Sequence, residues 1–296
     1  MKAMAATAFT LDAIATIELD VPAPKRGEIL VKISAASLNY RDLAVLSGKY
    51  IAGLPLPRVP ASDACGTVVA LGEGVSEWKV GDRVAPVYTQ GWHDGLPTVQ
   101  QRTRQTLGAP LPGVLQQYIA VPALDAVAPP PSLSDVEVAT LPIAALTAWS
   151  TLQEGGVKPG DVVLLQGTGG VSLFALQFAK AAGAKVIITS SSDAKLVRAR
   201  ALGADETINY RSNPDWELAA KEITGGRGVD IVVETAGATL SKSLAATAFG
   251  GFIGVVGFVA GPEATISLRQ LSSPASGLLA DRRVARFSRS MRVAAS

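Results

Sequence analysis

The residues best suited to chemistry form a short run in the middle of the chain, Gly167-Thr168-Gly169-Gly170-Val171-Ser172. Gly167 allows a tight turn, and Gly169 lets the backbone approach a bound pyrophosphate. Ser172 stands where a third glycine is usual and is small enough for close helix packing. Between a strand and a helix, such a turn predicts a dinucleotide site, because the helix N-terminus offers free N–H groups to phosphates. The alternative is a turn that only caps a helix.

The elements around this glycine turn have the required order. A strand is predicted at 162–166 and a helix at 173–183. Further strands (185–189, 206–209, 229–234, 252–257) alternate with further helices (194–203, 215–224, 240–249). This alternation predicts an α/β fold with a doubly wound parallel sheet and the cofactor at the carboxyl ends of its strands.

The chain before about residue 122 is predicted to be rich in β-structure. Strands are expected at 29–33 and 66–71, and a third follows a turn at 80–84. Frequent prolines argue against long helices, and 89–113 is predicted to be a loop. After a stiff run of three prolines, 134–152 is predicted to be partly helical, with Pro142 opening its second helix.

Composition excludes several classes of protein. A chain of 296 residues that is 48% hydrophobic can build about two domains with sizeable cores. A net charge of +2 favours neither a nucleic-acid nor a membrane partner, and no apolar run is long enough to span a bilayer. The single cysteine, Cys65, excludes a disulfide framework. We therefore expect a cytoplasmic protein that acts on a small-molecule substrate.

Six segments stand in a specific order: 36–42 (ASLNYRD), 72–75 with 81–84, 146–149, 157–161, the glycine turn, and 201–205. Together they resemble the medium-chain dehydrogenase/reductase superfamily, in particular its zinc-independent, quinone-oxidoreductase-like branch. The resemblance extends over residues 1–271. It implies a GroES-like β-rich catalytic domain at 1–125, a Rossmann NAD(P)-binding domain at 126–271, an active site in the cleft between them, and a homodimer.

The same resemblance bears on metal. Zinc-dependent members carry a cysteine early in the first domain and a Gly-His-Glu sequence further on. The corresponding positions here are Asn39 and Ala61-Ser62-Asp63. Neither Asn39 nor Ser62 is a good zinc ligand, and the four-cysteine structural zinc lobe is missing. The sequence therefore predicts no metal site.

The end of the second Rossmann strand determines the choice of nicotinamide cofactor. NAD sites place an acid there to hold the ribose 2′-OH, but this strand ends in Ser190-Ser191-Ser192 and the first acid is Asp193. A turn rich in hydroxyl groups admits a 2′-phosphate, and Lys195 can pair with it. By resemblance, Tyr210 also contacts that phosphate. We expect NADPH rather than NADH. The alternative is that this turn only caps a helix and that Lys195 is solvated.

The reacting residues are assigned by resemblance. It places Asn39 and Thr147 beside the nicotinamide, and Tyr40 and Asp42 along the substrate cleft. A tyrosine hydroxyl is protonated at neutral pH, so Tyr40 can donate a hydrogen bond to a carbonyl oxygen as hydride arrives. Packing of the Tyr40 ring is the alternative, and for Asp42 a structural hydrogen bond or ion pair is favoured.

A site without zinc has no Lewis acid to polarise a simple ketone or to activate an alcohol. Quinones and conjugated enones accept hydride more readily, because the developing charge is delocalised. The sequence thus predicts a zinc-independent, NADPH-dependent quinone or enone reductase. Two alternatives are an alcohol or ketone dehydrogenase, and a non-catalytic NADPH-binding protein or inactive truncated homologue.

Residues 272–296 form an atypical basic tail with five arginines, six serines and one acidic residue, Asp281. Relatives continue here with further strands of the Rossmann sheet and then return to the first domain. The composition of the tail favours a shift of reading frame over a divergent basic tail. We therefore expect the last strands of the sheet, and the dimer edge that they form, to be missing.

Overall fold

The computed structural model describes residues 1–51, 53–266 and 277–280, the last four as backbone only. The chain divides into two compact units, Met1–Leu146 and a second unit that begins at Thr147. Within the described ranges, every helix is too short or too polar to cross a bilayer.

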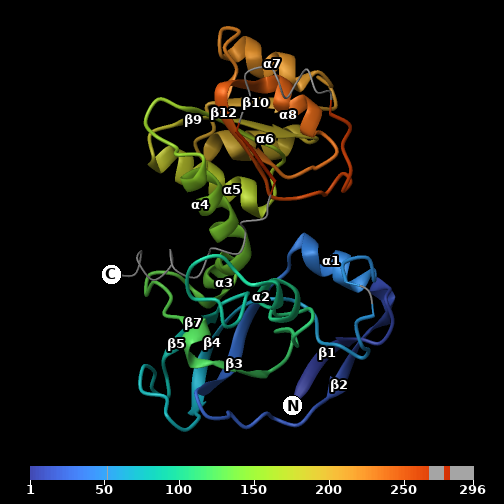
Figure 1. Cartoon of the computed structure of the whole chain (residues 1–296), viewed down its shortest axis with the longest axis vertical. Helices are drawn as coiled ribbons and strands as arrows, with labels where there is room; N and C mark the ends of the chain where they lie inside the picture. The colour runs from blue at the N-terminus through green and yellow to red at the C-terminus, as the bar shows by residue number, and fades with distance from the viewer. Residues whose placement is uncertain (52, 267–276, 281–296) are drawn as a thin grey trace. The chain divides into compact units, whose positions relative to one another are not determined.

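The first unit is built on a five-stranded antiparallel sheet of order β6-β3-β4-β5-β7, beside a two-stranded β1-β2 ribbon (Figure 1). Inward-facing residues of its strands, such as Ile29, Val31 and Val68, form one hydrophobic core. The predicted β-rich fold of this unit is confirmed. The strands are β1 (Lys2–Ala6), β2 (Ile14–Glu18), β3 (Glu28–Ser37), β4 (Asp63–Leu71), β5 (Arg83–Pro86), β6 (Tyr118–Pro122) and β7 (Ala126–Val127).

Helices in the first unit are short, as the prolines predicted. They are α1 (Tyr40–Leu46), α2 (Val99–Arg104), α3 (Asp135–Val138) and a π-helix (Leu141–Ala145) that Pro142 opens. The prediction of a loop throughout 89–113 is wrong, because α2 lies inside it. Thr98 and Gln101 form a capping box, in which each side chain bonds the backbone N–H of the other.

The second unit contains a six-stranded parallel sheet of order β10-β9-β8-β11-β12-β13. This is the strand order of a dinucleotide-binding Rossmann sheet, and the predicted fold is confirmed. Its strands are β8 (Val162–Leu165), β9 (Lys185–Ser190), β10 (Glu206–Asn209), β11 (Val229–Glu234), β12 (Thr247–Val255) and β13 (Gly277–Ala280). Its helices are α4 (Leu146–Glu154), α5 (Gly170–Ala181), α6 (Asp193–Ala201), α7 (Trp216–Ile223) and α8 (Leu240–Ala246).

Alternate residues of the parallel strands face two different hydrophobic cores. Val163 and Leu165 pack with residues of α4, α5 and α6, whereas Leu164 packs with residues of α7 and α8. Helices therefore cover both faces of the sheet (Figure 1), which is why its strands read as nearly continuous apolar runs.

Two predictions near the end of this sheet are wrong. The helix expected at 240–249 ends at Ala246, because β12 begins at Thr247 and pairs with Val229 of β11. A further strand, β13, pairs in parallel with β12, although no strand was expected after residue 271. Its sequence, Gly-Leu-Leu-Ala, is a short apolar run of the kind that parallel strands use. The rest of the basic tail, 272–276 and 281–296, lies outside the described residues.

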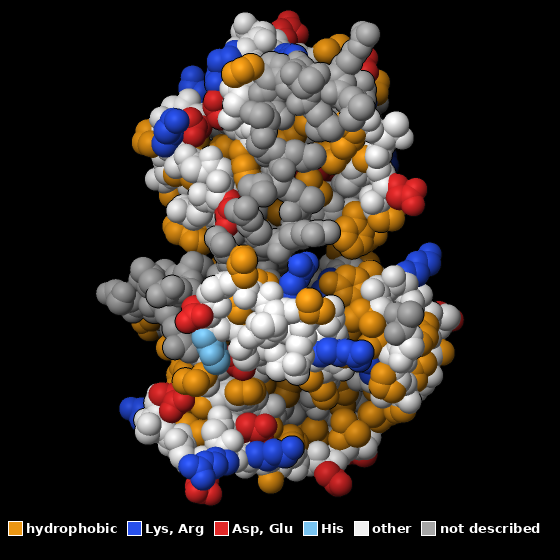
Figure 2. Space-filling model, viewed as in Figure 1, with side chains coloured by type: hydrophobic (Ala, Val, Ile, Leu, Met, Phe, Trp, Pro, Cys, Tyr) orange, Lys and Arg blue, Asp and Glu red, His pale blue; other side chains and the backbone are white. Residues whose placement is uncertain are grey.

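The described surface carries charges of both signs. On the face drawn in Figure 2, lysines and arginines are interspersed with acidic side chains. This distribution agrees with the small net charge of +2.

Candidate functional site

The glycine turn lies between β8 and α5, as predicted. Gly167 has a φ of +73°, a backbone conformation that glycine adopts without strain. Gly169 is the N-cap of α5, and a Cβ atom built on it would meet no atom within 4 Å. The N–H groups of Gly170, Val171 and Ser172 belong to the first turn of the helix, where no intrahelical acceptor is available. The turn therefore fits a dinucleotide, since it offers both space and donors to a pyrophosphate.

Two hydroxyl groups connect this turn to neighbouring strands. Ser172 is 1% exposed, and its Oγ donates to the Gln166 carbonyl at 2.7 Å. The Oγ1 of Thr168 lies 3.2 Å from the Oγ of Ser190, the last residue of β9. Ser172 thus fastens the start of α5 to the end of β8, which a glycine at this position could not do.

A buried carboxylate shapes the backbone at the end of β11. Glu234 is fully buried, and its Oε1 accepts hydrogen bonds from the N–H groups of Ala236 and Gly237, both at 2.9 Å. Its Oε2 accepts from the Gln166 side chain at 2.7 Å and from the Ser243 hydroxyl. Sequence reasoning missed this network, although a glutamate that ends an apolar strand is a visible signal.

The residues assigned to the cofactor ribose meet at the carboxyl ends of β9 and β10. Ser190 is 3% exposed, and Ser191 follows it at the start of the turn. Tyr210 comes directly after β10, and its N–H donates to the Ser190 carbonyl at 3.1 Å. The structure therefore brings Ser190, Ser191 and Tyr210 together beside the glycine turn.

Lys195 lies in the first turn of α6 and is exposed. Asp193, the first acid after β9, accepts a hydrogen bond from Asn209 Nδ2 at 2.7 Å. Asp193 thus has a protein partner on β10, whereas the side chain of Lys195 makes no hydrogen bond or ion pair with the part of the chain that the structure describes.

The other predicted residues lie near the start of α1 and in α4. Asn39 is the N-cap of α1, and the buried Asp42 accepts from the Asn39 N–H at 2.7 Å. Tyr40 is 48% exposed. Thr147 is buried in α4, where its carbonyl accepts from Thr151 Oγ1 at 2.7 Å.

Asp63 was noted in the sequence analysis among the positions that zinc ligands occupy in relatives, and the structure shows it hydrogen-bonded to the predicted residue Asn39. It is 1% exposed, and its Oδ2 accepts from Asn39 Nδ2 and from the Ile143 N–H, both at 3.0 Å. Its Oδ1 is buried without a hydrogen-bond partner in the described structure. Burial raises the pKa of Asp63 to about 7, and the hydrogen bonds from Asn39 and Ile143 offset that rise only in part. Burial also raises the pKa of Asp42.

Arg41, which the sequence analysis did not single out, anchors the same region. Its Nη1 donates to Ser62 Oγ at 2.7 Å and to the Leu107 carbonyl at 2.9 Å. Its Nη2 donates to the Ala109 carbonyl at 2.6 Å. The guanidinium also lies over two tyrosine rings, with its Cζ 4.9 Å from the centroid of Tyr50 and 4.8 Å from that of Tyr88. A fixed cation therefore stands beside Ser62 and Asp63.

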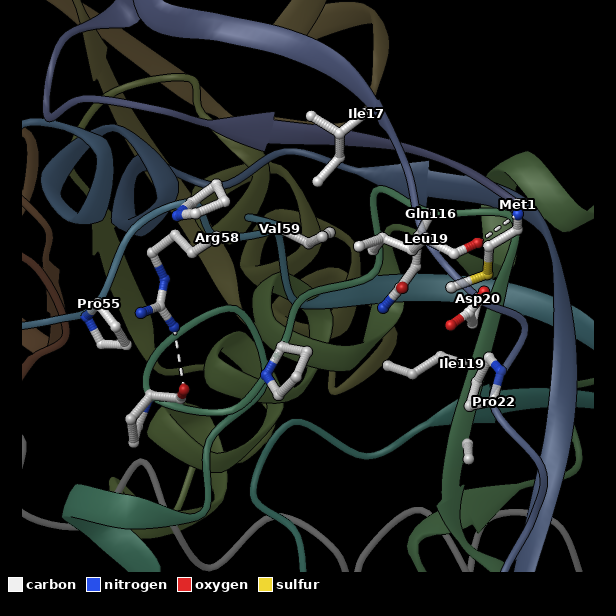
Figure 3. A pocket seen from close by; sticks show the side chains of 14 residues that line it. Met1, Ile17, Leu19, Asp20, Pro22, Pro55, Arg58, Val59, Gln116 and Ile119 are labelled. Carbon is white, nitrogen blue, oxygen red and sulfur yellow. Dashed lines mark hydrogen bonds between the residues drawn. The ribbon is translucent and has the colours of Figure 1, made fainter.

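A cavity of about 500 Å³ lies elsewhere in the first unit (Figure 3). Its walls are mostly apolar, with several prolines. Arg58 and Pro55 lie at one end, and Met1 and Asp20 lie at the other. Arg58 donates to the Pro110 carbonyl at 3.0 Å. None of the predicted site residues lines this cavity, and we do not assign the reaction to it.

Burial of Asp63 leads to a prediction about stability. Because its pKa is raised from 3.8 to about 7, the folded chain binds more protons than the unfolded chain between these pH values. The contribution of this group to stability therefore falls as pH rises through that range. The neutral side chain of Asp63→Asn does not undergo this loss. The unfolding free energy of the variant relative to wild type should therefore rise by on the order of 1–3 kcal/mol from pH 4 to pH 8. Urea unfolding across that range measures the gain. The exposed Asp12→Asn variant is the control. A stability difference between Asp63→Asn and wild type that does not change with pH would contradict the prediction.

Family models match both units. The model of the alcohol dehydrogenase GroES-like domain matches residues 25–132, and that of the zinc-binding dehydrogenase matches residues 170–287. A zinc-type alcohol dehydrogenase-like protein of Schizosaccharomyces pombe is 47% identical over 249 residues, which are 83% of this chain and 72% of that protein. The chain belongs to the medium-chain dehydrogenase/reductase superfamily. The second match also continues past residue 271, where the resemblance was expected to end.

Solved structures agree with this assignment. This medium-chain dehydrogenase/reductase is similar to a putative alcohol dehydrogenase from Sinorhizobium meliloti (43% identity, TM-score 0.87, 94% of this chain and 82% of that chain). It is also similar to a quinone oxidoreductase of Pseudomonas syringae (29% identity, TM-score 0.82, 99% of this chain and 86% of that chain). The protein is therefore an oxidoreductase of this superfamily, in its quinone-oxidoreductase-like branch.

Zinc appears in the names of several relatives, so the fit of the residues to zinc matters. In this medium-chain dehydrogenase/reductase, the Asn39 amide donates to Asp63, and the Ser62 hydroxyl donates to the Leu107 carbonyl while accepting from Arg41. Zinc sites need thiolate, imidazole or carboxylate ligands. Among the described residues, no three or more His, Cys, Asp or Glu side chains are grouped so that they could hold a metal ion. These residues do not fit a zinc ion of the usual ligand set.

Proposed function

We propose that this chain is a zinc-independent, NADPH-dependent oxidoreductase that transfers hydride to a quinone or to an activated enone or carbonyl compound. The observation that carries the proposal is the bonding of Asn39 and Ser62, which stand where zinc-binding relatives have ligands. Asn39 donates to Asp63, and Ser62 accepts from Arg41. An acceptor that delocalises negative charge needs no Lewis acid, which favours quinones and enones.

The second unit supports NADPH as the cofactor. When bound, NADPH supplies the hydride. The glycine turn and the start of α5 would hold its pyrophosphate, and Ser190, Ser191, Lys195 and Tyr210 would surround the ribose phosphate. No carboxylate occupies the end of β9 to repel that phosphate. One solved relative, a mycobacterial protein 28% identical to this chain, was determined in complex with NADPH.

The first unit would act on the acceptor. Asn39 and Thr147 would lie beside the nicotinamide, and Tyr40 would donate a hydrogen bond to the acceptor oxygen. The reduction of a quinone consumes one hydride and one proton and yields the hydroquinone and NADP⁺. The hydroxyl of Tyr40, a residue that is 48% exposed, would stabilise the oxygen on which charge develops, and solvent would supply the proton.

The proposal is tested by NADPH oxidation with a panel of quinones and enones, before and after dialysis against a zinc chelator. We expect turnover with at least one acceptor and a rate within twofold after chelation. No turnover with any acceptor would contradict the reductase. Loss of activity on chelation, restored by added zinc, would contradict zinc independence.

Lys195→Ala tests the phosphate assignment. We expect NADPH affinity to fall about tenfold, since a charge-assisted contact is lost, and NADH affinity to change less than twofold. Fluorescence titration with both cofactors measures the two effects. Lys185→Ala is the matched control, because it removes an exposed lysine at the opposite end of β9. Equal effects on NADPH and NADH would remove Lys195 from the phosphate site.

An alcohol or ketone dehydrogenase is the second candidate, because several relatives bear that description. Oxidation of a secondary alcohol with NADP⁺ by the chelated protein, faster than reduction of any quinone, would favour it.

A further inference from the structure

The cavity of about 500 Å³ in the first unit has apolar walls that are stiff (Figure 3). A proline ring fixes one backbone angle and has no N–H group, so a wall rich in proline resists collapse and offers few donors. The prolines of this lining are Pro22, Pro55, Pro57, Pro110 and Pro112, and its aliphatic residues include Ile17, Leu19, Val59 and Ile119. The cavity is thus preformed for an apolar ligand, within the range of volumes that small-molecule sites have.

The lining contains one buried cation, Arg58, which is 7% exposed. Its backbone is fixed to β1, because its N–H donates to the Ala6 carbonyl at 3.0 Å and its carbonyl accepts from the Ala6 N–H at 2.9 Å. In the side chain, Nη2 donates to the carbonyls of Pro110 and Leu111 at 3.0 and 3.4 Å. Nε is buried without a hydrogen-bond partner, and Nη1 makes no hydrogen bond to a described residue. Arg58 therefore retains N–H groups that have no acceptor among the described residues.

The charge of Arg58 is also uncompensated. Burial and, to a lesser extent, repulsion from Arg41 lower the pKa of Arg58, and no carboxylate contributes in the opposite direction. A guanidinium nevertheless stays protonated at neutral pH. A buried charge without a counter-ion costs free energy, which a bound anion would recover.

The other polar groups of the lining do not provide that anion. Asp20 lies at the opposite end of the cavity (Figure 3) and is exposed, so water weakens its field. The Gln116 side chain donates to the Gly113 carbonyl at 2.7 Å. An elongated ligand with one negative end would therefore place that end at Arg58 and extend its apolar part along the prolines.

We propose that this cavity is a binding site for an apolar monocarboxylate, whose carboxylate group pairs with Arg58 and whose hydrocarbon part lies against the proline and aliphatic walls. Hydrogen bonds between a guanidinium and a carboxylate are charge-assisted and strong. One negative charge balances one guanidinium, whereas a phosphate dianion would leave a charge unpaired in apolar surroundings. A straight chain of about eight carbons fits a cavity of this size. The site uses no residue of the proposed reaction and does not depend on it.

The test is calorimetric titration of the full chain with octanoate and with 1-octanol, its neutral counterpart. We expect octanoate to bind at a single saturable site about tenfold more tightly than 1-octanol, because only the carboxylate gains charge-assisted hydrogen bonds. Arg58→Met should lower the octanoate affinity about tenfold and leave the 1-octanol affinity within about twofold. Arg102→Met, which removes an exposed arginine of α2, is the control.

A second variant decides the matter if Arg58→Met unfolds. Leu19→Trp enlarges a lining residue that is 37% exposed, and it leaves Arg58 and its hydrogen bonds in place. Octanoate affinity should fall at least tenfold while the thermal unfolding temperature stays the same. Leu11→Trp is the matched control, since Leu11 is 58% exposed in the same unit and does not line the cavity.

Three results would overturn the inference. They are no saturable binding of octanoate, equal affinities of wild type for octanoate and 1-octanol, and undiminished octanoate binding by folded Leu19→Trp. None of these measurements requires NADPH, so failure of the proposed oxidoreductase activity would leave the inference about the cavity to be decided by the titrations alone.

Discussion

Replacing Gly169 with valine should weaken NADPH binding about 100-fold or more while the protein stays folded. In the structure, Gly169 has φ −83° and ψ 178°, which any residue can adopt, and a Cβ atom at this position meets no neighbour within 4 Å. The added side chain would therefore occupy only the space proposed for the pyrophosphate. The cost to folding is a poorer N-cap for α5, about 1 kcal/mol.

Fluorescence titration with NADPH and thermal unfolding measure these two effects separately. Ala181→Val is the matched control, because it adds a branched side chain at the exposed opposite end of the same helix. Undiminished NADPH affinity in Gly169→Val would show that the cofactor does not lie against this turn. A collapse of the fold in that variant would contradict the open space seen beside Gly169.

Replacing Arg41 with methionine should destabilise the first unit by about 3–5 kcal/mol, because at least two charge-assisted hydrogen bonds are lost. Methionine keeps much of the hydrophobic length of arginine but none of its donors. The carbonyls of Leu107 and Ala109 would each lose a hydrogen bond, and the cation that lies over the rings of Tyr50 and Tyr88 would disappear.

Urea unfolding of the variant at pH 7 measures this loss. Arg41→Lys should recover little of it, since a single ammonium cannot replace two guanidinium nitrogens that donate to separate acceptors. Arg26→Met is the control, because the Arg26 side chain is 81% exposed. A loss below about 1 kcal/mol in Arg41→Met would show that loop 106–109 is held by other contacts.

Much of the second unit could be predicted because its signals are local. The predicted strands 206–209 and 229–234 coincide with β10 and β11, since each is a short run rich in β-branched residues between turn residues. The boundary between α8 and β12 could not be predicted in this way. Small and apolar residues continue from Leu244 past Ala246, and only the distant pairing of Thr247 with Val229 ends the helix.

The candidate site was predictable in its residue types but not in its contacts. Asn39 was placed beside the nicotinamide by resemblance, and Asp63 was noted only among the positions compared with zinc ligands. Their hydrogen bond depends on the register of β3 and β4, in which Ser37 pairs with Asp63. No sequence pattern specifies that register across a separation of 24 residues. Arg41 lies inside the segment that carries the family resemblance, yet nothing in its spacing distinguishes a buried anchor from a solvated helix residue.

The hydrogen bonds behind the glycine turn have a thermodynamic consequence. Ser172 fastens α5 to the carbonyl of Gln166, and the Gln166 side chain is bonded in turn to Glu234. The backbone that would receive the phosphates is thus ordered when the chain folds, before any nucleotide arrives. The conformational entropy of this turn is therefore lost when the chain folds and not when the nucleotide binds. More of the free energy of the phosphate contacts then remains as binding affinity. The glycines provide the shape of the turn, and the buried polar network behind them provides its rigidity.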